Sequence, residues 1–136
     1  DLNKLLDLFE YEDIEIGTLI SPITEEADYH NPNVVKAVPT LFADGYCDIA
    51  YFSRAPIPYM EQFQANQSFK HIGVYAFSAD IFNELENMDG TDLEEAERLE
   101  QLRWLQNHII LSAIVTRSKL IGVDTPEDLA AVEKLL

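Results

Sequence analysis

The alternation of short β-prone runs with runs of helical periodicity constrains the fold of this chain more than any other feature. Residues rich in β-branched and aromatic side chains form runs at 14–20, 34–38, 47–53, 71–77 and 109–115. Apolar residues recur at helical spacing in 1–10, 78–85 and 92–107. Strands that alternate with helices are typical of an α/β domain built around one sheet. We therefore expect a single α/β domain that spans residues 1–136.

The turn signal Asp44-Gly45 separates two of the β-prone runs, 34–38 and 47–53. Runs joined by such a compact turn tend to pair as an antiparallel hairpin. A hairpin beside strands that are joined through helices predicts a mixed sheet flanked by helices. Residues 23–33 are rich in Pro, Asn, Asp and Glu, which favour turns, and residues 61–68 show no periodicity, so both segments are expected to be loops.

Two patterns predict which side chains face the core. Strand alternation places Ile72, Val74 and Ala76 on one face of the 71–77 run, and His71, Gly73, Tyr75 and Phe77 on the other. In the 92–107 run, Thr91 and Glu94 match a capping box that starts one long amphipathic helix. The inward-facing residues of this helix are expected to be Leu93, Ala96, Leu99, Leu102 and Leu105.

The charge balance excludes some partners. Nine Lys and Arg against 25 Asp and Glu give a formal net charge of 9 − 25 = −16. This charge repels phosphate backbones and anionic lipid headgroups, so neither nucleic acid nor a membrane is an expected partner. An anionic substrate would have to be bound by a few placed cations. No apolar run approaches the roughly 20 residues of a membrane-spanning helix, and a cytoplasmic location is expected.

The residues that commonly carry covalent or transition-metal chemistry are not grouped. Cys47 is the only cysteine, which rules out an internal disulfide, and its β-prone surroundings favour a place in the core. His30, His71 and His108 are far apart in sequence, so no zinc-like spacing occurs. Covalent catalysis and a zinc site are therefore not expected.

Five ordered blocks resemble the CMP-Kdo synthetases, cytidylyltransferases that activate the sugar acid 3-deoxy-manno-octulosonate (Kdo). The blocks are Asn31-Pro-Asn-Val-Val-Lys36, Tyr51-Phe-Ser-Arg-Ala-Pro-Ile-Pro58, His71-Ile-Gly-Val-Tyr75, Leu99-Glu-Gln-Leu-Arg103 and Gly122-Val-Asp-Thr-Pro-Glu-Asp-Leu129. The resemblance implies the C-terminal part of a Rossmann-like nucleotidyltransferase fold, which binds Kdo and forms a homodimer. Family members begin with a half that carries a basic triphosphate loop and a Gln-Gly-Asp-Glu-Pro segment, and neither occurs in this sequence.

The resemblance implies a reaction in which the anomeric hydroxyl of Kdo attacks the α-phosphorus of CTP and expels pyrophosphate, for lipopolysaccharide biosynthesis. The first residue is Asp1, and the first helix is already under way there, so we expect the chain to begin inside a longer protein. We therefore expect this chain to bind Kdo and to be inactive without the half that would hold CTP.

The resemblance also assigns the charged site residues. Asp124 is the expected catalytic residue and Mg²⁺ ligand, and Mg²⁺ is the expected cofactor. Asp124 could instead support the turn at Thr125, which caps a last helix with Pro126 at its first position. Arg54, at a strand end, is expected to bind the sugar-acid carboxylate, since a guanidinium suits a bidentate contact. The alternative for Arg54 is an ion pair within a very acidic chain.

Four more residues are expected to contact substrate. His71 and Tyr75 share a strand face, and four residues at roughly 3.3 Å each separate them by about 13 Å. They would flank a sugar pocket, although both could be packing residues. Glu100 and Gln101 would hydrogen-bond the sugar hydroxyls, and their alternative is a solvated helix face. Tyr59-Met60-Glu61 departs from the Asp-Arg pair of many family members, so the role of residues 59–69 stays open.

Two other functions remain possible on the sequence. A related sialic-acid-type cytidylyltransferase would use the same chemistry, although the 99–103 and 122–129 blocks favour Kdo. The chain alone could also be a non-catalytic dimerisation module that associates through an exposed sheet edge.

Overall fold

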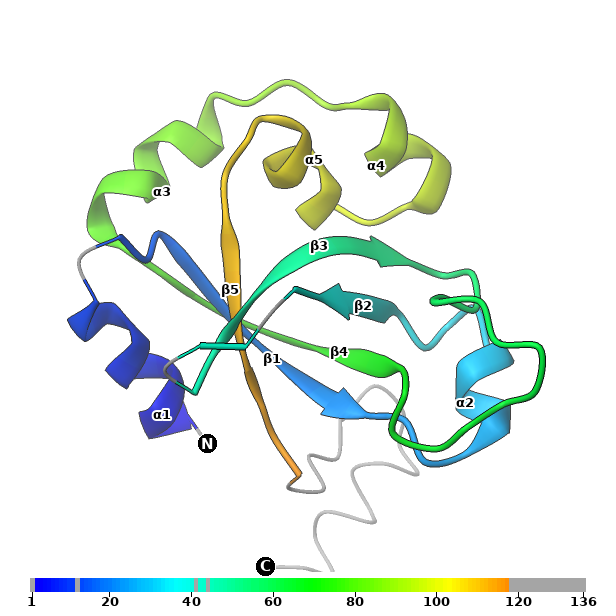
Figure 1. Cartoon of the computed structure of the whole chain (residues 1–136). Helices are drawn as coiled ribbons and strands as arrows, with labels where there is room; N and C mark the ends of the chain where they lie inside the picture. The colour runs from blue at the N-terminus through cyan, green and yellow to red at the C-terminus, as the bar shows by residue number, and fades with distance from the viewer. Residues whose placement is uncertain (1, 12, 41, 44, 118–136) are drawn as a thin grey trace, which may run out of the picture.

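A computed structural model of the chain describes residues 2–11, 13–40, 42–43 and 45–117 (Figure 1). The helices are α1 (Leu2–Asp7), the 3₁₀-helix η1 (Leu8–Glu10), α2 (Glu26–His30), α3 (Ala79–Glu86), α4 (Asp92–Glu97) and α5 (Gln101–Gln106). The strands are β1 (Ile16–Pro22), β2 (Lys36–Pro39), β3 (Cys47–Ser53), β4 (Phe69–Phe77) and β5 (Leu111–Val115). The predicted strands and the first helices are confirmed within a few residues. The helix predicted from Thr125 lies outside the described residues.

The five strands form one closed, mixed sheet in the order β1-β4-β2-β3-β5. β1 and β5 are parallel, whereas the other neighbours are antiparallel. The predicted hairpin is confirmed, since β2 pairs with β3 from Lys36 opposite Ser53 onward. Cys47 and Asp48 of β3 close the sheet against β5. Because each of these five strands has a neighbour on both sides, the expectation of an open sheet edge for association is wrong.

Two hydrophobic clusters lie on the two sides of β1. Ile16 and Ile20 belong to a cluster that includes side chains of α3 and α5, and Leu19 belongs to another with Leu5 and Leu8. All five residues from Ile16 to Ile20 are therefore buried, and β1 does not alternate between core and solvent. In Figure 1, α3, α4 and α5 lie together at the top of the view, and α1 lies apart from them at the left.

The predicted helix over 92–107 is wrong as a single element. The chain turns at Arg98, which adopts a left-handed conformation with φ 55°, and α5 begins only at Gln101. The Leu99 N–H reaches back to the Glu94 carbonyl at 3.3 Å, which is typical of a Schellman-type helix end. The turn buries Leu99 and Leu102, whereas Ala96, predicted to face inward, is exposed. The expected loop 23–33 also contains a short helix, α2.

Candidate functional site

The Arg54 side chain lies between two segments that are distant in sequence. Its Nε donates to the Glu97 carbonyl at 2.9 Å, and its two terminal nitrogens donate to the carbonyls of Pro32 (2.9 Å) and Arg98 (3.3 Å). Among the described residues, no carboxylate forms an ion pair with Arg54. A guanidinium has five N–H groups, so two of them, one on each terminal nitrogen, are not used by these bonds. Arg54 therefore holds the backbone and keeps enough donors for a carboxylate.

The Glu97 carboxylate collects donors from the end of β3. Its Oε1 accepts from the Ser53 hydroxyl at 2.6 Å and from the Tyr51 hydroxyl at 3.5 Å. Its Oε2 accepts from the Arg54 backbone N–H at 2.9 Å. Burial raises the pKa of Tyr51, and the negative charge of Glu97 raises it further. The Glu97 side chain thus connects the end of α4 to the end of β3, which Arg54 follows.

Lys36 is a second cation in this region and is fully buried. Its Nζ donates to the carbonyls of Asn31 at 2.8 Å and Val34 at 2.5 Å. Burial lowers the pKa of Lys36, and the nearby charge of Arg54 lowers it further, while Glu97 and Asp28 act in the opposite direction. Lys36 and Arg54 together hold three carbonyls of the segment 31–34.

His71 and Tyr75 are much closer together than strand spacing predicts. Their ring centroids are 5.3 Å apart, because the ladder shifts register between Thr18, opposite Tyr75, and Leu19, opposite Ile72. This bulge leaves Gly73 and Val74 outside the regular pairing and bends β4. The expected 13 Å separation is therefore wrong for the side chains. The predicted division of β4 into two faces is confirmed by the two hydrophobic clusters.

His71 is held as a neutral ring. Its Nε2 lies 2.9 Å from the Thr18 hydroxyl, which donates its own proton to the Val74 carbonyl at 2.7 Å. The hydroxyl must then accept from an Nε2–H, which leaves Nδ1 as an acceptor. Burial lowers the pKa of His71 to about 4. It also raises the pKa of Tyr75, with a smaller contribution from the Glu100 charge, so both rings are uncharged at neutral pH.

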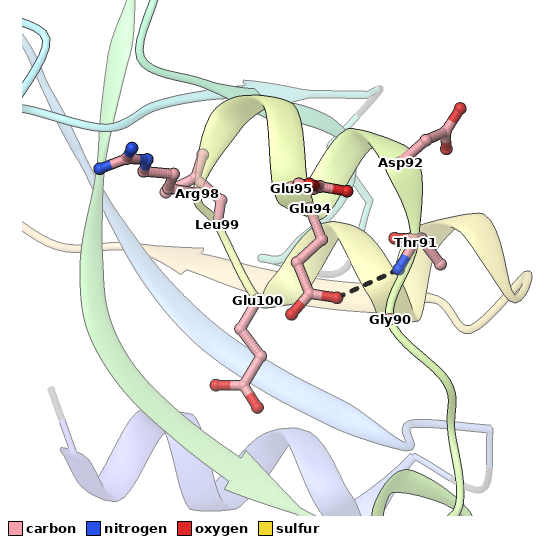
Figure 2. Close-up of a pocket in the computed structure, with 8 residues that line it drawn as sticks. All are labelled: Gly90, Thr91, Asp92, Glu94, Glu95, Arg98, Leu99 and Glu100. Carbon is pink, nitrogen blue, oxygen red and sulfur yellow. Dashed lines mark hydrogen bonds between the residues drawn. The ribbon is translucent and has the colours of Figure 1, made fainter.

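Glu100 and Gln101 follow the turn between α4 and α5. Glu100 is exposed and lines an open pocket of about 790 Å³, whereas Gln101 is only 6% exposed. The alternative of a solvated helix face is therefore wrong for Gln101. The pocket lining is Gly90, Thr91, Asp92, Glu94, Glu95, Arg98, Leu99 and Glu100 (Figure 2). It lacks Arg54, His71, Tyr75 and Gln101, so this pocket alone is not the predicted site.

A separate set of contacts fixes the helical hairpin formed by α4, the turn at residues 98–100 and α5, which carries Glu100. Arg103 donates to both Glu94 oxygens, at 2.8 and 2.7 Å, and to the Met88 carbonyl at 3.1 Å. Thr91 and Glu94 form the predicted capping box, although only its Glu94 arm, which accepts the Thr91 N–H at 3.4 Å, reaches bonding length (Figure 2). The position of the turn at residues 98–100 is therefore fixed from α4 and α5 as well as from β3.

The turn at residues 98–100 links several of the predicted residues. Arg54 contacts its first carbonyl, and Glu100 at its end influences Tyr75, which in turn contacts His71. The sequence did not single out Glu97 or Lys36. Both could have been noticed by position, since Lys36 ends the first block of the resemblance and Glu97 stands two residues before the Leu99–Arg103 block.

Metal ligands are not grouped in the described part of the chain. Within residues 2–11, 13–40, 42–43 and 45–117, no three His, Cys, Asp or Glu side chains gather as a metal site would require. Asp124, the predicted Mg²⁺ ligand and catalytic residue, lies outside these residues. Across the same residues, no helix is long and apolar enough to cross a membrane.

Comparison with known proteins places these features in a family. The sequence model described as cytidylyltransferase matches residues 2–117. The 3-deoxy-manno-octulosonate cytidylyltransferase of Thermodesulfovibrio yellowstonii is 41% identical over 141 residues, covering 99% of this chain and 54% of that protein. The enzyme of the same name from Cytophaga hutchinsonii is 42% identical over 127 residues, covering 88% of this chain and 49% of that protein.

A solved structure agrees with the sequence comparisons. It is described as CMP:2-keto-3-deoxy-manno-octonic acid synthetase complexed with CTP, and it matches with a TM-score of 0.85 and 31% identity. The match covers 99% of this chain and 54% of that one. The chain thus spans about half the length of the curated relatives it matches.

Proposed function

Because this chain belongs to the cytidylyltransferase family, we propose that it supplies the Kdo-binding, C-terminal portion of an enzyme that forms CMP-Kdo and pyrophosphate from CTP and Kdo. One observation carries this proposal. Arg54 binds the first carbonyl of the turn at residues 98–100, Glu100 ends that turn, and Tyr75, whose pKa the Glu100 charge helps to raise, packs against Trp104 of α5 just after it. Such convergence of a cation, a phenol and a carboxylate suits a sugar acid with several hydroxyls.

Arg54 is the residue proposed to bind the Kdo carboxylate. Three of its N–H groups are held by backbone carbonyls, which fixes the plane of the guanidinium before any ligand arrives. The two remaining N–H groups match the number that a bidentate carboxylate contact uses. Holding the fork in advance lowers the entropy that binding would otherwise cost.

The remaining predicted residues are proposed to orient the sugar. Glu100 would accept hydrogen bonds from Kdo hydroxyls, and Gln101 would both accept and donate. The unprotonated Nδ1 of His71 would accept from one hydroxyl, while the Tyr75 phenol would donate. Because His71 and Tyr75 stay uncharged at neutral pH, they add no negative charge near an anionic substrate.

Within the reaction, this chain would bind and orient the nucleophile. The anomeric hydroxyl of Kdo would attack the α-phosphorus of CTP, and pyrophosphate would leave. Mg²⁺ would offset the phosphate charge when bound, with Asp124 as its proposed ligand in this chain. Since Asp124 would be only one ligand, with the phosphates and the remaining part of the protein supplying others, the chain alone is proposed to bind the ion weakly. CTP would be held by the remaining part of the protein.

Several properties of the whole enzyme accompany this proposal. The names of the similar proteins favour Kdo over a sialic-acid-type substrate. A homodimer and a cytoplasmic location are also proposed, on the basis of the resemblance to CMP-Kdo synthetases. The isolated chain is proposed to be a binder and not a catalyst.

Titration calorimetry with Kdo and the isolated chain tests this proposal. The unaltered chain should bind Kdo more tightly than N-acetylneuraminate. Arg54→Ala should lose about 1.5–3 kcal/mol of binding free energy, roughly 10- to 150-fold in affinity, because the carboxylate loses a charged bidentate contact. Arg54→Lys should lose most of this affinity as well, since an ammonium cannot form the fork.

Lys4→Ala is the matched control, because it removes one positive charge from α1, which lies apart from α4 and α5 (Figure 1). Its Kdo affinity should equal that of the unaltered chain. Equal Kdo binding by Arg54→Ala and the unaltered chain would refute the role of Arg54. An unaltered chain that binds no Kdo would contradict the proposed function itself.

A further inference from the structure

Glu97 stands immediately before the turn at residues 98–100 and is bound to the end of β3 by its side chain. Its carboxylate accepts from two hydroxyls and one backbone N–H, all of them at the end of β3. Hydrogen bonds to an ionised acceptor are roughly twice as strong as those between neutral groups. The contact therefore fixes the end of α4 firmly against the strand that precedes Arg54.

The main chain of Glu97 strengthens the same junction. Its carbonyl accepts from the Arg54 Nε at 2.9 Å, while its carboxylate accepts from the Arg54 backbone N–H at 2.9 Å. The backbone and the side chain of Arg54 are thus both held by one residue. The adjoining Arg98 carbonyl accepts from a terminal nitrogen of Arg54 at 3.3 Å.

The position of Glu97 in the chain extends its influence to the predicted sugar contacts. The next residue, Arg98, has the left-handed conformation, which is unfavourable for a residue other than glycine. That conformation changes the direction of the chain just before Glu100 and Gln101. Since the carboxylate holds the residue before the turn, it also constrains where the turn begins.

Glu97 also affects the second cation of this region. Burial is the largest cause of the lowered pKa of Lys36, the charge of Arg54 lowers this pKa further, and the charge of Glu97 raises it. Lys36 donates to the Asn31 and Val34 carbonyls, and Arg54 donates to the Pro32 carbonyl between them. Glu97 therefore favours the charged form of a residue that holds the segment beside Arg54.

We infer that Glu97 is a positioning residue, which holds Arg54 and the Glu100-Gln101 pair in a single arrangement for sugar-acid binding. This role rests on the proposed function, because the arrangement matters only if these residues bind the sugar. Glu97 acts through Arg54 and through the turn, and it need not touch the substrate.

Three variants at Glu97 separate geometry from charge. Glu97→Ala removes every side-chain contact, and Glu97→Asp keeps the charge but is one methylene too short to reach β3. Both should weaken Kdo binding by about tenfold or more in titration calorimetry. Glu97→Gln should stay within about threefold of the unaltered chain. Its amide oxygen can accept from the Arg54 N–H, and its NH₂ group can donate to the Ser53 hydroxyl oxygen.

Leu5→Ala is the control for a general loss of stability, because it removes a buried side chain from the cluster that α1 forms with Leu8, Ile14 and Leu19, on the other side of β1 from α5. It should lower the thermal unfolding temperature without changing Kdo affinity below that temperature. The inference is overturned if Glu97→Ala binds like the unaltered chain, if Glu97→Gln is as weak as Glu97→Ala, or if Leu5→Ala weakens binding equally.

A measurement without ligand keeps this inference separate from the proposed function. In NMR spectra of the free chain, the Arg54 Nε–H and backbone N–H resonances should shift and exchange faster in Glu97→Ala, and should return toward their original values in Glu97→Gln. If the unaltered chain bound no Kdo, the proposed function would fail while this readout still tested the arrangement. Unchanged Arg54 resonances in Glu97→Ala would overturn the inference.

Discussion

His71 is a neutral histidine that lies between a threonine and two aromatic rings. His71 contacts Phe52 and Tyr75, with ring centroids 4.8 and 5.3 Å away, and its Nε2 meets the Thr18 hydroxyl. Charging a ring in such surroundings is unfavourable, since burial disfavours the ionised form. The folded state therefore prefers His71 without its second proton.

This preference predicts a pH dependence of stability. The pKa of His71 is lowered from 6.5 to about 4 in the folded state, so its contribution is complete above pH 6.5 and is lost as the pH falls toward 4. Linkage gives a loss of about 2 kcal/mol in the free energy of unfolding between pH 7.5 and 5. Urea denaturation of the unaltered chain and of His71→Phe at both pH values measures the difference.

The His71→Phe variant should lose less stability than the unaltered chain over this interval, because it has no group to protonate there. His30→Gln, which replaces an exposed histidine, should keep the original dependence. Comparing variants at each pH cancels the titration of the many carboxylates. Identical pH dependence of His71→Phe and the unaltered chain would rule out the proposed burial of a neutral ring.

At the residue scale, the sequence singled out candidate residues but did not predict the contacts that they make. Arg54 stood out as a cation at a strand end, but its three carbonyl partners come from residues 32, 97 and 98, which no local pattern connects to it. Glu97 looked like one acid among many on a helix face. Its importance comes from the packing of α4 against β3, a contact across more than 40 residues of sequence.

At the element scale, close packing of α1 against β1 depends on one glycine. A Cβ built on Gly17 would lie 3.0 Å from Leu5 Cδ1 and 3.4 Å from Leu8 Cδ1. Both leucines are almost fully buried, so they have little room to move away. Gly73, in the neighbouring strand β4, has no atom within 4 Å of the same built position.

Gly17→Ala should therefore destabilise the chain by about 1–3 kcal/mol, the usual cost of overpacking a core. Gly73→Ala is the matched control and should be neutral or slightly stabilising, because alanine also restricts the unfolded chain. Urea denaturation of both variants measures the difference. Equal stability of the two alanine variants would contradict the described packing of α1.

Helix ends were the least predictable elements, for a physical reason. The apolar spacing of 92–107 continues through Arg98, so the pattern predicts a single helix. The chain breaks there because the turn buries Leu99 and Leu102 and because Arg54 and Arg103 bind on either side of it. These are tertiary contacts, and they outweigh the local preference of the sequence. The β4 bulge, which brings His71 to Tyr75, likewise leaves no clear mark in the strand pattern.

At the scale of the whole molecule, the class of fold was predictable and its closure was not. Alternating strands and helices indicated a mixed α/β sheet, and the hairpin turn gave one antiparallel pair. Closure requires Cys47 and Asp48 of β3 to meet Ala113 and Ser112 of β5, where the Ser112 hydroxyl donates to Asp48 at 3.0 Å. Pairing between residues so far apart in sequence follows from the packing of the complete sheet.

The central claim is that this chain performs the sugar-acid part of cytidylyl transfer, and a chimaera tests it most directly. This chain would replace the matched portion, 54%, of the Thermodesulfovibrio yellowstonii relative in one polypeptide. Pyrophosphate release would then be measured with CTP, Kdo and Mg²⁺. We predict Kdo-dependent release by the chimaera, strongly reduced release by its Arg54→Ala variant, and none by the isolated chain. A folded chimaera that releases no pyrophosphate, beside an active unaltered relative, would contradict the account.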